Sequence, residues 1–156
     1  MKKGKINWKL LILSLVIVYA AAFIGSLLMS DSSSSDWYQS IKPSITPPSY
    51  IFPIVWNILF FLIAISFYLI LNQKFKSKNK LISLFILNFI LNILWTLFYF
   101  RMQNPLLALI DILFLWVSIL LLVIFTYKIS KTSSYFLMPY LVWVSFAIIL
   151  NSLSIK

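Results

Sequence analysis

Long apolar stretches divide the chain into five segments, separated by short polar turns and by one longer loop. The stretches cover approximately residues 8–29, 52–72, 81–100, 105–127 and 135–153. Each has close to the roughly 20 residues with which an α-helix crosses a hydrocarbon core. Their apolar residues run continuously instead of alternating with polar ones, which favours helices over barrel strands. The pattern predicts an all-α membrane protein: one domain, residues 1–156, built as a bundle of five transmembrane helices.

Composition agrees with this prediction and excludes several kinds of chemistry. The chain is 62% hydrophobic, its mean hydropathy is +1.00, and 10% of its 156 residues are charged, whereas soluble domains carry roughly a quarter. It contains no cysteine and no histidine. Disulfides, the usual zinc sites, serine–histidine triads and the common axial ligand of haem are therefore excluded. We expect no metal and no resident cofactor.

Basic residues are distributed unequally between the two ends of the predicted helices. Ten lie before or at the start of the first helix or fill the second and fourth connections: Lys2, Lys3, Lys5, Lys9, Lys74, Lys76, Lys78, Lys80, Lys128 and Lys131. The other side has Lys42, Arg101 and Lys156. By the positive-inside rule the N-terminus is cytoplasmic, and the long loop and the C-terminus are outside. The net charge of +10 thus orients the protein in its lipid bilayer, and we expect no nucleic-acid partner. Abundant Lys, Ile and Asn suggest an AT-rich bacterial genome, and hence a location in the bacterial plasma membrane.

The connection between the first and second helices is about 22 residues long, from Ser30 to Ile51. This is longer than a simple connection between two helices needs. It contains Trp37 followed by the run Y-Q-S-I-K-P-S-I-T-P-P, whose prolines stiffen the backbone. We interpret this segment as a lid over the helices.

Polar and aromatic residues recur at helical spacing on three of the predicted helices, so each set shares one face. The sets are Trp56, Phe60 and Ala64; Asn88, Asn92, Trp95, Thr96 and Tyr99; and Tyr140, Trp143, Ala147 and Asn151. Such faces must turn away from lipid. Two roles remain open for the asparagines: hydrogen bonds that hold helices together, or contacts to a ligand.

Depth favours a ligand pocket for the aromatic residues. Counted from the outer ends of the helices at 1.5 Å per residue, Trp56 lies roughly 6 Å and Trp143 roughly 16 Å below the outer surface. The depths of Trp95, Asn92 and Ala147 fall between these two values. They share the outer half of the membrane beneath the proline-rich loop, where indoles and amides suit a flat, largely apolar ligand. Asp111 is the only acidic residue within a predicted helix. We interpret it as a buried, hydrogen-bonded strut, because a carboxylate facing lipid costs on the order of 3 kcal/mol.

Several blocks of residues, in order along the chain, resemble the TspO family of tryptophan-rich sensory and translocator proteins. These blocks are Trp37-Tyr38, Lys42-Pro43-Ser44, Pro47-Pro48, Val55-Trp56, Leu91-Asn92 with Trp95, Ala108-Leu109 with Asp111, Pro139-Tyr140-Leu141, Trp143, Phe146-Ala147 and Leu150-Asn151. The resemblance implies a ligand cavity under the first long loop, porphyrins such as protoporphyrin IX as ligands, and a homodimer. Carried over by motif, the ligand-binding residues are Tyr38, Trp56, Phe60, Asn88, Asn92, Trp95, Trp143 and Ala147.

Three functions follow as hypotheses. The first is a porphyrin-binding receptor, sensor or carrier. The second is light-dependent oxidative degradation of protoporphyrin IX, for which the resemblance implicates Trp56 and Trp143. The third is a structural membrane subunit, in which the polar faces only hold helices together. Ile45, Tyr50 and Ile93 replace tryptophans that the family often has, so the ligand preference is expected to differ. Independently of the resemblance, Ala21 and Gly25 form a small-x3-small pair that suggests a close contact between two copies.

Overall fold

The structure is a computed structural model that describes residues 6–29 and 34–155, and all regular elements in these ranges are helical. Its elements are α1 (Trp8–Met29), α2 (Asp36–Ile41), α3 (Ile51–Leu71), α4 (Lys78–Thr96), the π-helical turn η2 (Leu97–Arg101), α5 (Pro105–Tyr127) and α6 (Lys131–Leu153). Five of them, counting α4 and η2 as one, are long and apolar enough to cross a membrane. The predicted all-α membrane fold is confirmed.

Local capping explains two differences from the predicted boundaries. α6 begins at Lys131 rather than at 135, because the Ser130 side chain accepts a hydrogen bond from the Ser133 N–H at the first turn. The long connection, which we treated as a loop, contains the short helix α2. Ser35 caps this helix by accepting a hydrogen bond from the Tyr38 N–H at 3.3 Å. The prediction of a proline-stiffened loop therefore missed a helical turn within this segment.

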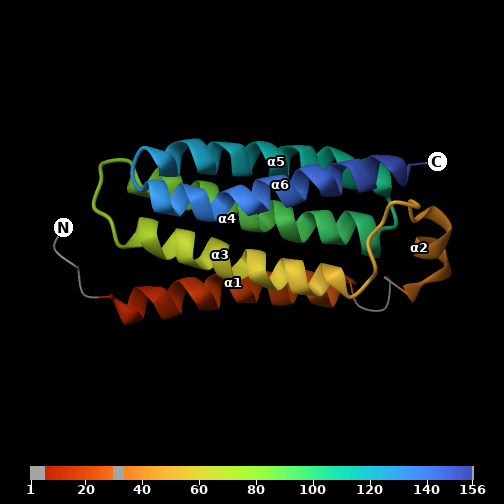
Figure 1. Cartoon of the computed structure of the whole chain (residues 1–156), viewed down its shortest axis with the longest axis horizontal. Helices are drawn as coiled ribbons and strands as arrows, with labels where there is room; N and C mark the ends of the chain where they lie inside the picture. Colours follow the sequence, from red (N-terminus) through yellow and green to blue (C-terminus); the bar gives the residue numbers. More distant parts are fainter. Residues whose placement is uncertain (1–5, 30–33, 156) are drawn as a thin grey trace.

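The long helices form a closed ring in the order α1, α3, α6, α5, α4, with α4 returning to α1. Figure 1 shows them side by side along the long axis, with the start of α1 and the end of α6 at opposite ends. Although α3 and α4 are consecutive in sequence, they have little contact. α4 and α6 both adjoin α5 but are not neighbours in the ring. Side chains that join α4 to α6 must therefore cross its interior.

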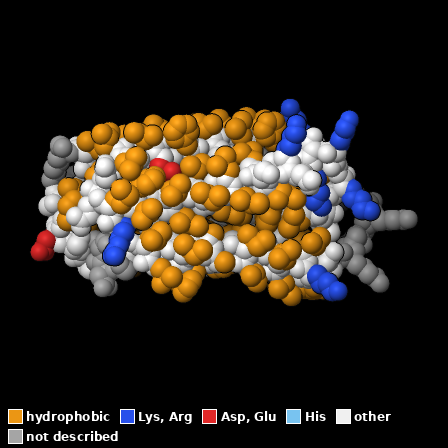
Figure 2. Space-filling view, turned by 180° about the vertical axis from the view of Figure 1, so that it is seen from behind, with side chains coloured by type: hydrophobic (Ala, Val, Ile, Leu, Met, Phe, Trp, Pro, Cys, Tyr) orange, Lys and Arg blue, Asp and Glu red, His pale blue; other side chains and the backbone are white. Residues whose placement is uncertain are grey.

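The two ends of the ring differ in charge. One end, here called the lid end, carries α2, the turn between η2 and α5, and the end of α6 (Figure 1). The other, the lysine end, carries the start of α1 and the turns before α4 and α6. Figure 2 shows basic side chains gathered at the lysine end and apolar side chains along the sides. Lys2, Lys3, Lys5 and Lys156, which the charge count included, lie outside the described residues.

Packing also differs between the two halves. The fully buried core lies mainly toward the lysine end and includes Phe67, Phe85, Leu122 and Leu137. Toward the lid end, three of the same helices change character. None of the residues 51–58 in α3, 90–98 in α4 and η2, or 145–149 in α6 is fully buried. The lid half of the ring therefore leaves more side-chain surface accessible than the lysine half.

Gly25 lies at a contact within the chain. It is buried on α1, and a Cβ atom at this position would lie 3.7 Å from Oγ1 of Thr96 on α4. Ala21, one turn earlier, is partly buried and packs against the core. A small residue lets two helices approach closely whether they belong to one chain or to two. Gly25 thus serves a contact of α1 with its own chain, and the predicted dimer stays a prediction.

Candidate functional site

Three of the predicted site residues form one aromatic wall on α3 and α6. Trp56 stacks on Phe60 with ring centroids 5.3 Å apart, and its edge meets Tyr140 at 6.2 Å. Trp143 lies against Phe52, with centroids 5.9 Å apart. Trp56, Phe60 and Trp143, here called the indole wall, are each only partly buried. The structure thus brings these residues to one seam and leaves part of their surface accessible.

Hydrogen bonds across the interior join α4 to α6, and we call this set the polar ladder. The Asn92 Nδ2 donates to the Tyr140 hydroxyl at 3.2 Å, the Tyr140 hydroxyl donates to Asn88 Oδ1 at 3.4 Å, and Trp95 Nε1 donates to Asn151 Oδ1 at 3.0 Å. Both ends of the ladder also reach α5. Asn88 Nδ2 donates to Ser118 Oγ, and Asn151 Nδ2 donates to the Pro105 carbonyl, each at 2.8 Å. Asn88 and Asn151 therefore hold helices together, one of the two roles left open by the sequence.

Tyr140 joins the indole wall to the polar ladder. Its ring meets Trp56, its hydroxyl bonds to Asn88 and Asn92, and its side chain is fully buried. Sequence reasoning placed Tyr140 on the inward face of its helix but not among the site residues. Its helical spacing from Trp143 and Ala147 was the sequence signal that could have placed it among them. Ala147, two turns further along α6, is partly buried and packs against the core beside these residues.

Tyr38 lies at the mouth of the ring, packed on the end of α4 and η2. Its ring centroid is 5.7 Å from Phe100 and 6.4 Å from Tyr99, and the neighbouring Trp37 lies 5.9 Å from Tyr99. Burial, with a smaller contribution from Tyr99, raises the pKa of the Tyr38 hydroxyl above its ordinary value. This hydroxyl is therefore neutral at physiological pH and available as a hydrogen-bond donor.

Tyr99 connects the lid to the site. It stacks on Trp95 with centroids 5.4 Å apart, and its hydroxyl shares a hydrogen bond of 2.7 Å with Ser154 at the end of α6. The π-helical turn η2 buries both Tyr99 and Phe100 beneath α2. Sequence reasoning placed Tyr99 on the polar face of its helix, but its contact with the lid was missed. Such a contact between distant segments has no signal in local spacing.

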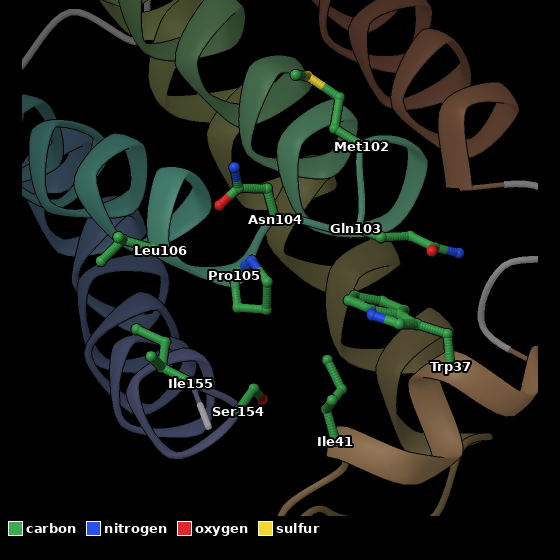
Figure 3. Close-up of a pocket in the computed structure, with 9 residues that line it drawn as sticks. All are labelled: Trp37, Ile41, Met102, Gln103, Asn104, Pro105, Leu106, Ser154 and Ile155. Carbon is green, nitrogen blue, oxygen red and sulfur yellow. The ribbon is translucent and has the colours of Figure 1, made fainter.

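A pocket of about 450 Å³ opens on the outer flank of the lid. Figure 3 shows its walls: Trp37 and Ile41 from α2, residues 102–106 from the turn into α5, and Ser154 and Ile155 after α6. Gln103 in this turn has a positive φ of 51°, and Asn104 caps α5 by accepting from the Leu107 N–H at 3.0 Å. None of the eight predicted site residues lines this pocket.

Comparison with known proteins now identifies the family. The sequence profile of the TspO/MBR family matches residues 13–154. The chain belongs to the TspO/MBR family. Its relatives include the tryptophan-rich protein TspO of Chlorobaculum tepidum, 39% identical over 93% of this chain and 94% of the relative, and that of Archaeoglobus fulgidus, 37% identical over 90% and 92%. The tryptophan-rich sensory protein of Cereibacter sphaeroides is 25% identical over 93% of this chain and 89% of its own.

Replacing Tyr99 tests the lid contact of this TspO/MBR protein. Tyr99→Leu removes the ring on which Trp37 and Tyr38 pack, and each aromatic pair contributes about 0.5–1.5 kcal/mol. We expect backbone amides of α2 to exchange with deuterium about tenfold faster, measured in lipid nanodiscs. Tyr99→Phe keeps the ring and loses only the hydrogen bond to Ser154, so it is the control. Equal exchange of α2 in wild type and Tyr99→Leu would show that other contacts hold the lid.

Proposed function

We propose that this protein is a membrane receptor or sensor that binds a flat, largely apolar ligand of the porphyrin class. The ligand lies in the lid half of the ring, between the indole wall and the polar ladder. The observation that carries this proposal is partial exposure: seven of the eight predicted site residues are partly buried, and Asn88 alone is fully buried. The same helices bury their inward faces fully toward the lysine end. If the inward-facing side chains served only to stabilise the fold, we would expect them to be fully buried in both halves of the ring.

The chemistry of these residues suits such a ligand. Indole rings stack favourably on a flat aromatic face, and a few amides orient polar edges. Because the chain has no histidine or cysteine, binding uses stacking, shape and hydrogen bonds in place of the usual axial ligation. The relative from Cereibacter sphaeroides is named a sensory protein, which supports the role of a sensor.

The polar ladder alone would also fit the structural-subunit hypothesis, because its asparagines do hold helices together. That hypothesis leaves the accessible surface of Trp56 and Trp143 without a role. Degradation of the ligand in light is separable from binding. If the protein degrades protoporphyrin IX, illumination will bleach the bound pigment faster than the free pigment in the same lipid.

Ala147→Leu is the direct test of binding. The added methylene groups would occupy space beside the indole wall, and overpacking costs about 1–3 kcal/mol. We expect the affinity for protoporphyrin IX to fall about tenfold or more, measured by quenching of tryptophan fluorescence in nanodiscs. Ala20→Leu, at an exposed position of α1, is the matched control and should leave the affinity unchanged. Unchanged affinity with a lowered melting temperature would make Ala147 a packing residue and contradict the proposed site.

We propose that the lysine end faces the cytoplasm of a bacterial plasma membrane, because most basic residues lie there. The chain has no cysteine, so single cysteines report topology directly. In intact cells, an impermeant maleimide should label Ser44→Cys in the connection before α3 and spare Ser77→Cys in the turn before α4. The opposite pattern would invert the proposed orientation.

We further propose that the protein is a homodimer in the membrane. The support is the resemblance to a family whose members are usually homodimers. The Gly25 position adds no support, because it lies at a contact within its own chain. The mass in nanodiscs should be twice the 18.2 kDa of one chain. The mass of a single chain in both nanodiscs and mild detergent would contradict this proposal.

A further inference from the structure

Asn57 carries an amide group on the outward surface of α3. The residue is exposed, although it lies six residues after Ile51, the first residue of the helix. At 1.5 Å per residue this is about 9 Å along a helix that crosses a hydrocarbon core of roughly 30 Å. By contrast, Asn88, Asn92 and Asn151 all turn into the polar ladder. Asn57 thus presents an amide toward lipid, whereas these three asparagines point away from it.

Only part of the hydrogen-bonding capacity of this amide is used within the described part of the chain. The Tyr19 hydroxyl on α1 donates to Asn57 Oδ1 at 3.0 Å. The oxygen can accept one further hydrogen bond, and the Nδ2 group has two N–H donors. No hydrogen bond from Nδ2 is present among residues 6–29 and 34–155. Lipid tails offer neither donors nor acceptors, so a partner for these N–H groups must come from another molecule.

Exposed serines in the same spans differ from Asn57 in this respect. Ser26 Oγ on α1 donates to the Phe23 carbonyl, and Ser152 Oγ on α6 donates to the Ile149 carbonyl, each at 2.8 Å. A hydroxyl has one donor, which the backbone of its own helix can accept. The two donors of the Asn57 amide are not used in this way. An exposed amide in a membrane span, unlike an exposed hydroxyl, therefore points to a partner outside the chain.

We propose that Asn57 lies at the centre of the interface between two copies of this chain. This inference rests on the proposed homodimer and names the surface through which it forms. Two copies inserted in the same orientation hold Asn57 at the same depth, so a two-fold axis along the membrane normal brings the two amides together. The partial charges are then complementary, because each Nδ2 donates to the carbonyl oxygen of the other amide. Each Oδ1 also keeps its hydrogen bond from Tyr19.

Large apolar side chains surround this amide. Ile54 and Phe61 lie one turn before and after Asn57 on the same face of α3, and Phe23 lies one turn after Tyr19 on α1. All three are exposed. Apolar side chains alone are expected on any surface that faces lipid, so they do not identify a partner. Around a pair of amides they supply an apolar surrounding, in which hydrogen bonds between helices are strengthened.

Single cysteines test the interface directly, because the chain has no cysteine. Ile54→Cys lies one turn from Asn57. Ile110→Cys is the matched control, since Ile110 is 49% exposed against 56% for Ile54 and lies on α5, which is not a neighbour of α1 or α3 in the ring. Oxidation with copper phenanthroline in membranes should link Ile54→Cys into a covalent dimer at least tenfold more than Ile110→Cys. Equal cross-linking of the two, or none at Ile54→Cys, would overturn the proposed interface.

A second substitution in Ile54→Cys isolates the role of the amide. Asn57→Leu removes the amide and keeps a side chain of similar size. The protein-to-lipid ratio that gives half-maximal cross-linking in vesicles should rise about tenfold. Tyr19→Phe removes only the hydrogen bond within the chain and should leave this ratio unchanged. An unchanged ratio with Asn57→Leu, or an equal rise with Tyr19→Phe, would contradict a hydrogen bond between the two amides.

The failures of the inference and of the proposed homodimer are distinguishable. The mass of a single chain in both nanodiscs and mild detergent would overturn both. A dimeric mass without cross-linking of Ile54→Cys would leave the homodimer standing and overturn this interface. Ile54→Cys retains Asn57, so its result is decisive even if Asn57→Leu folds poorly. Cross-linking needs no ligand, and the proposed binding site is tested separately by Ala147→Leu.

Discussion

The pairing of amide and hydroxyl groups across the ring is the constraint on which the rest of the structure depends. In hydrocarbon, a polar side chain without a partner is costly, so the asparagines of α4 can lie within the membrane only if α6 and α5 supply partners. Tyr140 of α6 pairs with both Asn88 and Asn92, and at a second level Asn151 of α6 accepts a hydrogen bond from the Trp95 indole. These bonds span helices that are not neighbours in the ring. They fix the relative position of α4 and α6, while the fully buried apolar core lies mainly toward the lysine end.

The division of the ring into a dense half and a more accessible half has a direct consequence for binding. Stability comes from the buried aliphatic and aromatic core toward the lysine end. The lid half is then free to present indole and amide surface. Structural roles and proposed ligand roles meet on one face of α4, where Asn88 and Asn92 both bond to Tyr140. A mutation on this face therefore affects the fold and the binding to different degrees.

Aromatic contacts join the described part of the lid to the ring. Trp37 and Tyr38 pack on Tyr99 and Phe100, and Tyr99 stacks on Trp95 of the site. Contacts of this kind are individually modest, so several of them together position the lid. The same stack gives a physical connection between the position of the lid and the surroundings of a site residue.

The sequence by itself determined the five helices, because a membrane span requires a long apolar run and such runs are local features. It also determined which helix faces turn inward, because helical spacing places Trp56, Asn92 and Trp143 on defined stripes. Tertiary structure decided the rest. The order of the ring sets which stripes meet, so Tyr140 became the link between them and Gly25 a contact within the chain. One carboxyl oxygen of Asp111, which we expected to be hydrogen-bonded, has no partner among the described residues. This emerged only from the structure, since whether a polar atom finds a partner depends on neighbours distant in sequence.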